Sequence, residues 1–242
     1  MAAPHPPGAA TVRNVHRLLD KRFGPLDPPR RLDPVEELIL TVFSQNTSDV
    51  NRDRAYASLT ARFGSWQEVL DAPSEEVADA IRPGGLANTK APRIQAILRA
   101  IEERQGRIDL GFLHGMSDGQ VGEYLRTLPG VGPKTASCVL AFSLKRPAIP
   151  VDTHVYRTAV RLGWVPEGTS VERAHQIMEE LVPPAIRVTM HVGLIRLGRQ
   201  VCKPGRPRCE ECPVQTVCPT APSVLSGAWD RKQEKDRKKK SG

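Results

Sequence analysis

The segment LPGVGPKTASCVLAF, residues 128–142, decides the fold. Gly130 and Gly132 allow a tight turn and a close approach of the backbone to another chain. A helix is expected to end near Leu128, and a new one to begin around Pro133, which suits a first helical turn. The amide groups of such a turn form a nest for an anion. The segment predicts a helix-hairpin-helix that grips the phosphate backbone of DNA, with a purely structural turn as the alternative.

Composition and charge agree with a nucleic-acid partner. The 242-residue chain carries 35 Lys and Arg against 27 Asp and Glu, a net charge of +8. A basic balance of this size favours an acidic partner, most often nucleic acid. No apolar run is long enough to span a membrane, and the N-terminus MAAPHPPGAA does not resemble a secretion signal. We therefore expect a cytoplasmic, nucleoid-associated bacterial protein that keeps its thiols reduced.

Apolar residues recur at helical spacing along most of the chain, and strand-like alternation is not found. A first helix is expected over Thr11–Phe23. Asp33, Pro34 and Glu36 then form a helix start in which Asp33 caps and Glu36 reaches back. The same capping pattern recurs further along the chain, at Ser65 with Glu68, Ser117 with Gln120 and Thr169 with Glu172. The sequence therefore predicts an all-α fold.

Four cysteines near the C-terminus form a ligand set. Their order is C-x6-C-x2-C-x5-C, at Cys202, Cys209, Cys212 and Cys218. All-thiolate ligation with short gaps suits zinc or an iron–sulfur cluster, and the spacing alone favours zinc. Disulfides are the weaker alternative for a chain expected in a reducing compartment. The fifth cysteine, Cys138, lies in an apolar run and is expected in the core.

A third motif, VDTHVYR, covers residues 151–157. Asp152 follows a proline and precedes a helical stripe, so taken alone it predicts an ordinary helix N-cap. His154, taken alone, predicts a surface or core histidine.

Together, LPGVGPKTA, VDTHVYR and the cysteine quartet resemble the endonuclease III family of DNA glycosylases over roughly residues 10–220. The resemblance implies a [4Fe–4S] cluster, in place of zinc, on Cys202, Cys209, Cys212 and Cys218. It also implies two all-α domains with the active site in the cleft between them. One is a six-helix barrel domain at residues 34–147, with the helix-hairpin-helix at about 118–142. The other, the iron–sulfur cluster domain, combines residues 11–33 with 148–220.

Both ends of the chain fall outside these domains. Residues 1–10 are rich in Pro and Ala, and the basic tail 221–242 has no apolar residue from Asp230 onward. We expect both to be disordered.

The resemblance implies a catalytic pair, Lys134 and Asp152. A neutral lysine amine attacks C1′ of a flipped-out nucleotide and forms a Schiff base, after which the 3′ phosphate leaves by β-elimination. Asp152 assists deprotonation or stabilises positive charge on the sugar. The expected protein is a monomeric, bifunctional glycosylase and abasic-site lyase. Its expected substrate is double-stranded DNA that contains an abasic site or an oxidised pyrimidine such as thymine glycol.

The resemblance also implies DNA-contacting residues. Within SQNTSD, residues 44–49, either Gln45 or Asn46 fills the gap left by the flipped base, and Leu86 in GGLANTKA, residues 84–91, is a wedge into the opposite strand. Other expected contacts come from the hairpin, from the third motif and from the loop between the first two cysteines: Gly130, Val131, Gly132, His154, Lys203, Arg206 and Arg208.

This sequence departs from many relatives at three positions: Ala87 replaces Tyr, Pro133 replaces Arg and Ser137 replaces Asn. Two other functions stay open. One is a glycosylase for a mismatched or alkylated base, and the other is a non-catalytic iron–sulfur protein that senses damage or redox state on DNA.

Overall fold

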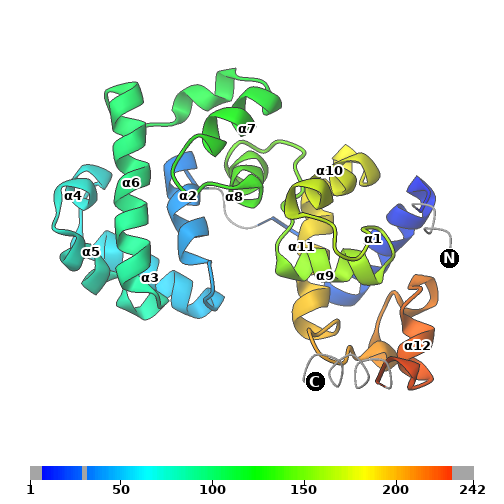
Figure 1. The fold of residues 1–242 in the computed structure, drawn as a ribbon. Coiled ribbons are helices and arrows are strands. Elements are labelled where there is room, and N and C mark those ends of the chain that lie inside the picture. Colours follow the sequence, from blue (N-terminus) through cyan, green and yellow to red (C-terminus); the bar gives the residue numbers. More distant parts are fainter. Residues whose placement is uncertain (1–6, 29–31, 231–242) are drawn as a thin grey trace. The chain divides into compact units, whose positions relative to one another are not determined.

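The computed structural model describes residues 7–28 and 32–230, and these ranges contain helices and turns but no strand, which confirms the all-α prediction. The chain divides into two compact units, Arg30–Arg146 and Met1–Pro29 with Pro147–Gly242 (Figure 1). The predicted six-helix domain, 34–147, covers nearly the same residues as the first of these. Over the described ranges, no helix combines the length and the apolar character needed to cross a bilayer.

The unit Arg30–Arg146 is organised around its longest helix, α6 (Figure 1). This helix packs against α2, α4 and α5, and α2 packs in turn against α3 and α8. The elements in chain order are α2 Pro34–Phe43, α3 Asp49–Arg62, α4 Trp66–Asp71, α5 Ser74–Ala80, the 3-10 helix η1 Arg82–Gly84, α6 Ala87–Gln105, the 3-10 helix η2 Gly111–Gly115, α7 Asp118–Arg126, α8 Pro133–Cys138 and the π-helix η3 Val139–Ser143.

The core of this unit follows the apolar stripes of the sequence. Phe43, Ile94 and Ile101 are completely buried, and Cys138 is buried as predicted. At Gly84 a Cβ atom would lie 2.9 Å from the Cβ of Ala55, so only glycine lets η1 approach α3 this closely.

The predicted helix starts are confirmed at three of four places. Asp33 and Ser117 both form complete capping boxes, and Ser65 accepts a hydrogen bond from the amide of Glu68. The fourth prediction is wrong by one residue. Ser170, not Thr169, caps α10, because the hydroxyl of Thr169 donates instead to the carbonyl of Pro166.

The second unit packs α1 and α9 against α11. Its apolar core includes Val12, Leu19, Val155, Met178 and Leu194. The elements are α1 Ala9–Phe23, α9 Thr153–Arg161, α10 Val171–Leu181, η4 Pro184–Ile186, α11 Arg187–Gln200, η5 Cys209–Glu211, η6 Gln215–Val217 and α12 Ala221–Leu225, the three η elements being 3-10 helices.

Both ends carry more structure than the composition predicts. Helix α1 begins at Ala9, inside the segment expected to be disordered. At the other end, α12 buries Ala221 and Val224, and the guanidinium of Arg161 lies 5.1 Å from the ring centroid of Trp229. The start of the tail is therefore packed by two buried apolar side chains and one cation–π contact. The rest of the two predicted segments, residues 1–6 and 231–242, lies outside the described residues.

Candidate functional site

The predicted hairpin joins α7 to α8. Gly130 has a φ of +70°, in the region that favours glycine, and Gly132 forms the N-cap of α8 with Pro133 in its first turn. Val131 is 7% exposed, and its amide donates to the carbonyl of Leu128 at 3.2 Å. Its side chain therefore supports the turn from inside, although it was expected among the DNA contacts. These features form the predicted helix-hairpin-helix.

Lys134 is the second residue of α8 and is partly exposed. Its ammonium interacts electrostatically with the carboxylate of Glu37, which lies on α2 and is buried. Thr41, one turn further along α2, donates from Oγ1 to Glu37 Oε1 at 3.3 Å. The predicted nucleophile therefore has a buried carboxylate nearby that the sequence motifs do not include.

The two predicted intercalating loops both present a residue with a positive φ. Asn46 is exposed with a φ of 53°, and Leu86 is 56% exposed with a φ of 52°. Non-glycine residues seldom adopt this left-handed conformation, and when they do it is often at functional sites. A large exposed leucine in such a conformation suits the predicted role as a wedge.

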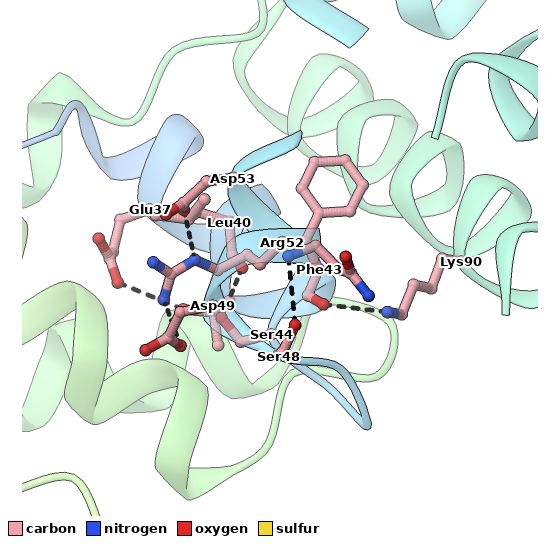
Figure 2. Close-up of polar contacts among 11 residues, drawn as sticks. Glu37, Leu40, Phe43, Ser44, Ser48, Asp49, Arg52, Asp53 and Lys90 are labelled. Atoms are coloured by element: carbon pink, nitrogen blue, oxygen red, sulfur yellow. Dashed lines mark hydrogen bonds and ion pairs between the residues drawn. The ribbon is translucent and has the colours of Figure 1, made fainter. Parts of the chain in front are cut away.

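Lys90 and Arg93 of α6 tie these loops together. The buried Lys90 donates from Nζ to the carbonyls of Phe43 at 2.9 Å and of Gly84 at 3.0 Å, and Figure 2 shows the first of these bonds. Arg93 donates from Nη1 to Gln45 Oε1 at 2.8 Å. The side chain of Gln45 is therefore engaged inside the protein, whereas that of its neighbour Asn46 is exposed.

Asp152 is the N-cap of α9, and its Oδ1 accepts from the amide of Val155 at 2.7 Å. The residues before it are held by two buried histidines. The amide of Val151 donates to His175 Nε2 at 2.9 Å, and His191 Nδ1 lies 2.7 Å from the carbonyl oxygen of Pro150. Asp152 therefore caps its helix as expected from the sequence, and the backbone directly before it is held in place by the two histidines.

His154 is partly buried on α9, with Arg157 Nη2 3.2 Å from its Nδ1. Burial lowers the pKa of His154, and the nearby Asp152 partly opposes this effect. The neutral imidazole is the form that accepts a hydrogen bond from Arg157.

The four cysteines of the quartet line one pocket. No disulfide joins the cysteines of the described chain, so all four thiols are available. Burial raises the pKa of Cys209 to about 11 and that of Cys212 to about 12. All four donors around the pocket are thiols, and an all-thiolate donor set is the one that iron–sulfur clusters take.

Arg161, also in this pocket, holds the loop that follows Cys202. Its guanidinium donates to Cys202 Sγ at 3.3 Å and, at 2.6–3.1 Å, to the three successive carbonyls of residues 203–205. Its own carbonyl accepts from Thr220 Oγ1 at 2.7 Å. One arginine thus fixes the backbone of the loop from inside.

The three predicted DNA-contacting residues of this loop have internal partners. Lys203 donates to the carbonyl of Arg199, and Arg206 pairs with Glu210 and Asp230, each at 3.3 Å. Arg208 pairs with Glu211 at 2.8 Å. Such exposed pairs contribute at most about 1 kcal/mol each, so a phosphate can replace the carboxylates.

Sequence reasoning missed several residues of these sites, namely Glu37, Lys90, Arg93, Arg161, His175 and His191. A charged residue on an apolar helix face is unusual unless it has a partner. That signal was visible at Lys90, which has the helical spacing of Ile94 and Ile97, whereas Glu37 lies off the stripe of Val35 and Leu38.

Comparisons with known proteins agree with these features. Residues 39–184 match the HhH-GPD superfamily base excision DNA repair protein family. Endonuclease III of Thermotoga maritima is 37% identical over 210 residues, which cover 86% of this chain and 92% of that protein. A protein of Arabidopsis thaliana named as a putative DNA glycosylase is 39% identical over 165 residues, 68% of this chain, and the match spans 56% of that protein's length.

A solved structure of a trapped endonuclease III–DNA covalent intermediate is similar with a TM-score of 0.76 and 27% sequence identity. The match covers 90% of this chain and 99% of that one. The resemblance indicated by the three motifs is confirmed. The chain belongs to the endonuclease III family of DNA glycosylases, within the HhH-GPD superfamily of base excision DNA repair proteins.

Proposed function

We propose that this protein is a bifunctional DNA glycosylase and abasic-site lyase that removes oxidised pyrimidines of the thymine glycol type from double-stranded DNA. The observation that carries the proposal is the position of Lys134. It follows the hairpin directly, at the start of α8, and it has a buried carboxylate nearby. A lysine in this position supplies an amine where a bound phosphate backbone would present a flipped-out sugar.

The reaction uses the amine of Lys134 as nucleophile. Its nitrogen attacks C1′ as the damaged base leaves with the electron pair of the glycosidic bond, and the adduct becomes a Schiff base. The positive imine acidifies a proton at C2′, and loss of that proton expels the 3′ phosphate. Asp152 stabilises positive charge on the sugar or assists proton removal. Its anchored backbone and its capping bond support this role, because they preorganise the carboxylate.

The exposed tips of the two loops support base flipping. We assign the gap-filling role to Asn46, because the other candidate, Gln45, is held by Arg93. Leu86 enters the opposite strand. A flipped nucleotide leaves a gap whose stacking energy must be replaced, and one polar and one apolar side chain can do so together.

A [4Fe–4S] cluster is the group that the four cysteines would hold. The fit rests on four free thiols around one pocket and on the all-thiolate donor set. When bound, the cluster supplies a rigid cross-link between Cys202 and the later three cysteines. The chain's own contribution is Arg161, which shapes the loop so that Lys203, Arg206 and Arg208 face DNA phosphates.

Borohydride trapping tests the proposal. Wild-type protein is incubated with a duplex that contains one abasic site, and the reduced imine is resolved on a denaturing gel. We expect a covalent complex that is lost in Lys134→Ala and kept in Lys145→Ala, an exposed control lysine of the same unit. Duplexes with single defined lesions then identify the preferred base. Binding of abasic DNA without trapping would favour the non-catalytic sensor instead.

A further inference from the structure

Glu37 is a buried acid that no motif explains. It lies in the middle of α2 and is 6% exposed, although carboxylates are seldom buried without a reason. Its immediate neighbour Glu36 is different. Glu36 completes the capping box of α2 with one carboxylate oxygen and accepts from the hydroxyl of Tyr56 with the other. Two adjacent glutamates on one helix therefore have separate environments.

The charged groups around Glu37 come from two helices that pack against α2. From α8, Lys134 interacts with it electrostatically. From α3, the guanidinium of Arg52 faces its carboxylate in Figure 2.

Arg52 itself is held by Asp49 at 3.1 Å and by Asp53 at 2.8 Å. From α6, Lys90 is directed to the carbonyls of Phe43 and Gly84. The remaining packed element, η3, has the sequence VLAFS and contributes no charge.

We propose that Glu37 is a positioning residue for the reaction of Lys134, which accepts a proton from the lysine ammonium and so prepares the amine for attack on C1′. The inference rests on the proposed function, since it requires Lys134 to be the nucleophile. Glu37 acts through Lys134 and does not touch the DNA. The packing of α2 against α8 brings the two groups close enough to interact electrostatically, and burial of Glu37 disfavours its charged form, which makes it a stronger base than an exposed glutamate.

The proton transfer takes place between Lys134 and Glu37 alone. One N–H bond of the ammonium breaks, its electron pair stays on nitrogen, and the proton forms an O–H bond with Glu37. The neutral nitrogen then uses that pair to form the bond to C1′, while the glycosidic pair leaves with the base, which takes a proton from solvent. Glu37 returns its proton to solvent after the lysine is released.

The acidity of Glu37 supports this role. Burial, opposed chiefly by Lys134, raises its pKa from 4.5 to about 7. An ordinary glutamate is a very weak base toward an ammonium with a pKa of about 10.4. A carboxylate with a pKa near 7 is matched to the pH at which the reaction would run, as a proton acceptor in catalysis should be.

A structural role is the competing explanation, because Glu37 also neutralises part of the charge of Arg52. The two roles differ in their dependence on pH. A residue that accepts the proton of Lys134 is no longer needed at a pH high enough for the lysine to lose its proton to the solvent. A packing or charge-balancing residue is equally needed at every pH.

The experiment measures the single-turnover rate of borohydride trapping on an abasic duplex between about pH 6 and pH 10. It compares wild type, Glu37→Gln, Glu37→Asp and the control Glu36→Gln. Circular dichroism and binding of the same duplex verify that each variant is folded. Lys134→Ala shows that the trapped adduct depends on the lysine.

We expect the trapping rate of the wild type to rise through a step near pH 7, as Glu37 ionises. Glu37→Gln should lose this step and trap about 100-fold more slowly at neutral pH. The difference in trapping rate from wild type should disappear as the pH approaches the pKa of free lysine. Glu37→Asp should recover part of the rate, and Glu36→Gln should match wild type.

An equal deficit of Glu37→Gln at every pH, or no deficit at all, would overturn the inference and leave the proposed function intact. Absence of trapping by the wild type would instead overturn the proposed function, and this inference with it.

Discussion

Arg93 donates a hydrogen bond from Nη1 to Oε1 of Gln45 at 2.8 Å, and so links α6 to the turn between α2 and α3. The same arginine lies against the hairpin, because a Cβ atom at Gly130 would be 3.0 Å from Arg93 Nε. One side chain therefore joins two segments expected to contact DNA. Gln45 is part of this support, whereas Asn46 is at the exposed tip.

Substitution of Gln45 and of Asn46 should distinguish the residue that supports the loop from the residue that fills the gap left by the flipped base. Asn46→Ala should reduce base excision from duplex DNA by about tenfold, roughly 1.4 kcal/mol of transition-state stabilisation, because the vacated space stays unfilled. Its trapping on single-stranded abasic DNA should be unchanged, since no gap is formed there. Gln45→Ala should cost less excision activity. A larger loss in Gln45→Ala than in Asn46→Ala would show that Gln45 fills the gap.

Lys90 should stabilise the fold and take no part in the chemistry. Lys90→Met keeps the stem but leaves the carbonyls of Phe43 and Gly84 without their donor. The free energy of unfolding should fall by about 2–4 kcal/mol, as measured by urea denaturation. Lys145→Met, at an exposed lysine, should change it by less than about 0.5 kcal/mol. Equal stability of Lys90→Met and wild type would contradict the assigned hydrogen bonds.

Glu37 should make the protein less stable as the pH rises. Its pKa is about 7 in the folded state against an ordinary 4.5, so between these values the folded state holds a proton that the unfolded chain has released. The free energy of unfolding should therefore drop by about 3 kcal/mol as the pH increases through this window.

Glu37→Gln should remove that drop, because an amide does not titrate. The difference between the two proteins in urea titrations at pH values below and above the window isolates this residue from the histidines. If the difference in the free energy of unfolding between wild type and Glu37→Gln stays constant with pH, the pKa of Glu37 is not raised in the folded state.

Arg161 should control both the cysteine pocket and the basic loop. Arg161→Met removes the hydrogen bonds to Cys202 Sγ and to the loop carbonyls. We expect faster loss of the broad absorbance near ~400 nm of thiolate-bound iron during exposure to a chelator. DNA affinity should also fall, with a smaller slope against salt, because fewer phosphates are contacted. The exposed control Arg173→Met should behave as wild type. Unchanged iron retention and salt slope in Arg161→Met would refute this role.

Features that depend on residues close together in the chain could be predicted from the sequence. The capping boxes at Asp33 and Ser117 involve residues three apart, so their side chains meet wherever the helix forms. The hairpin at Gly130 and the cysteine spacing are local in the same sense. Helix periodicity likewise predicted the all-α class without any knowledge of tertiary contacts.

Contacts between distant segments could not be predicted in this way. Lys90 reaches Phe43 across 47 positions, and Arg161 reaches the 202–205 loop across more than 40. Their partners are backbone carbonyls, which every residue has, so no sequence pattern marks them. The ordered start of the tail was missed for a related reason. Trp229 directly precedes the polar stretch that begins at Asp230, and its contact with the guanidinium of Arg161 forms only after folding.

Lys134 is the residue proposed to form the covalent bond to DNA. A peptide map by mass spectrometry of the borohydride-reduced complex between the wild-type protein and an abasic oligonucleotide identifies the bonded residue. We predict one modified peptide, with the sugar remnant on Nζ of Lys134. A modification on another lysine, such as Lys90 or Lys203, or no modification in a protein that binds the same DNA, would show that Lys134 is not the nucleophile.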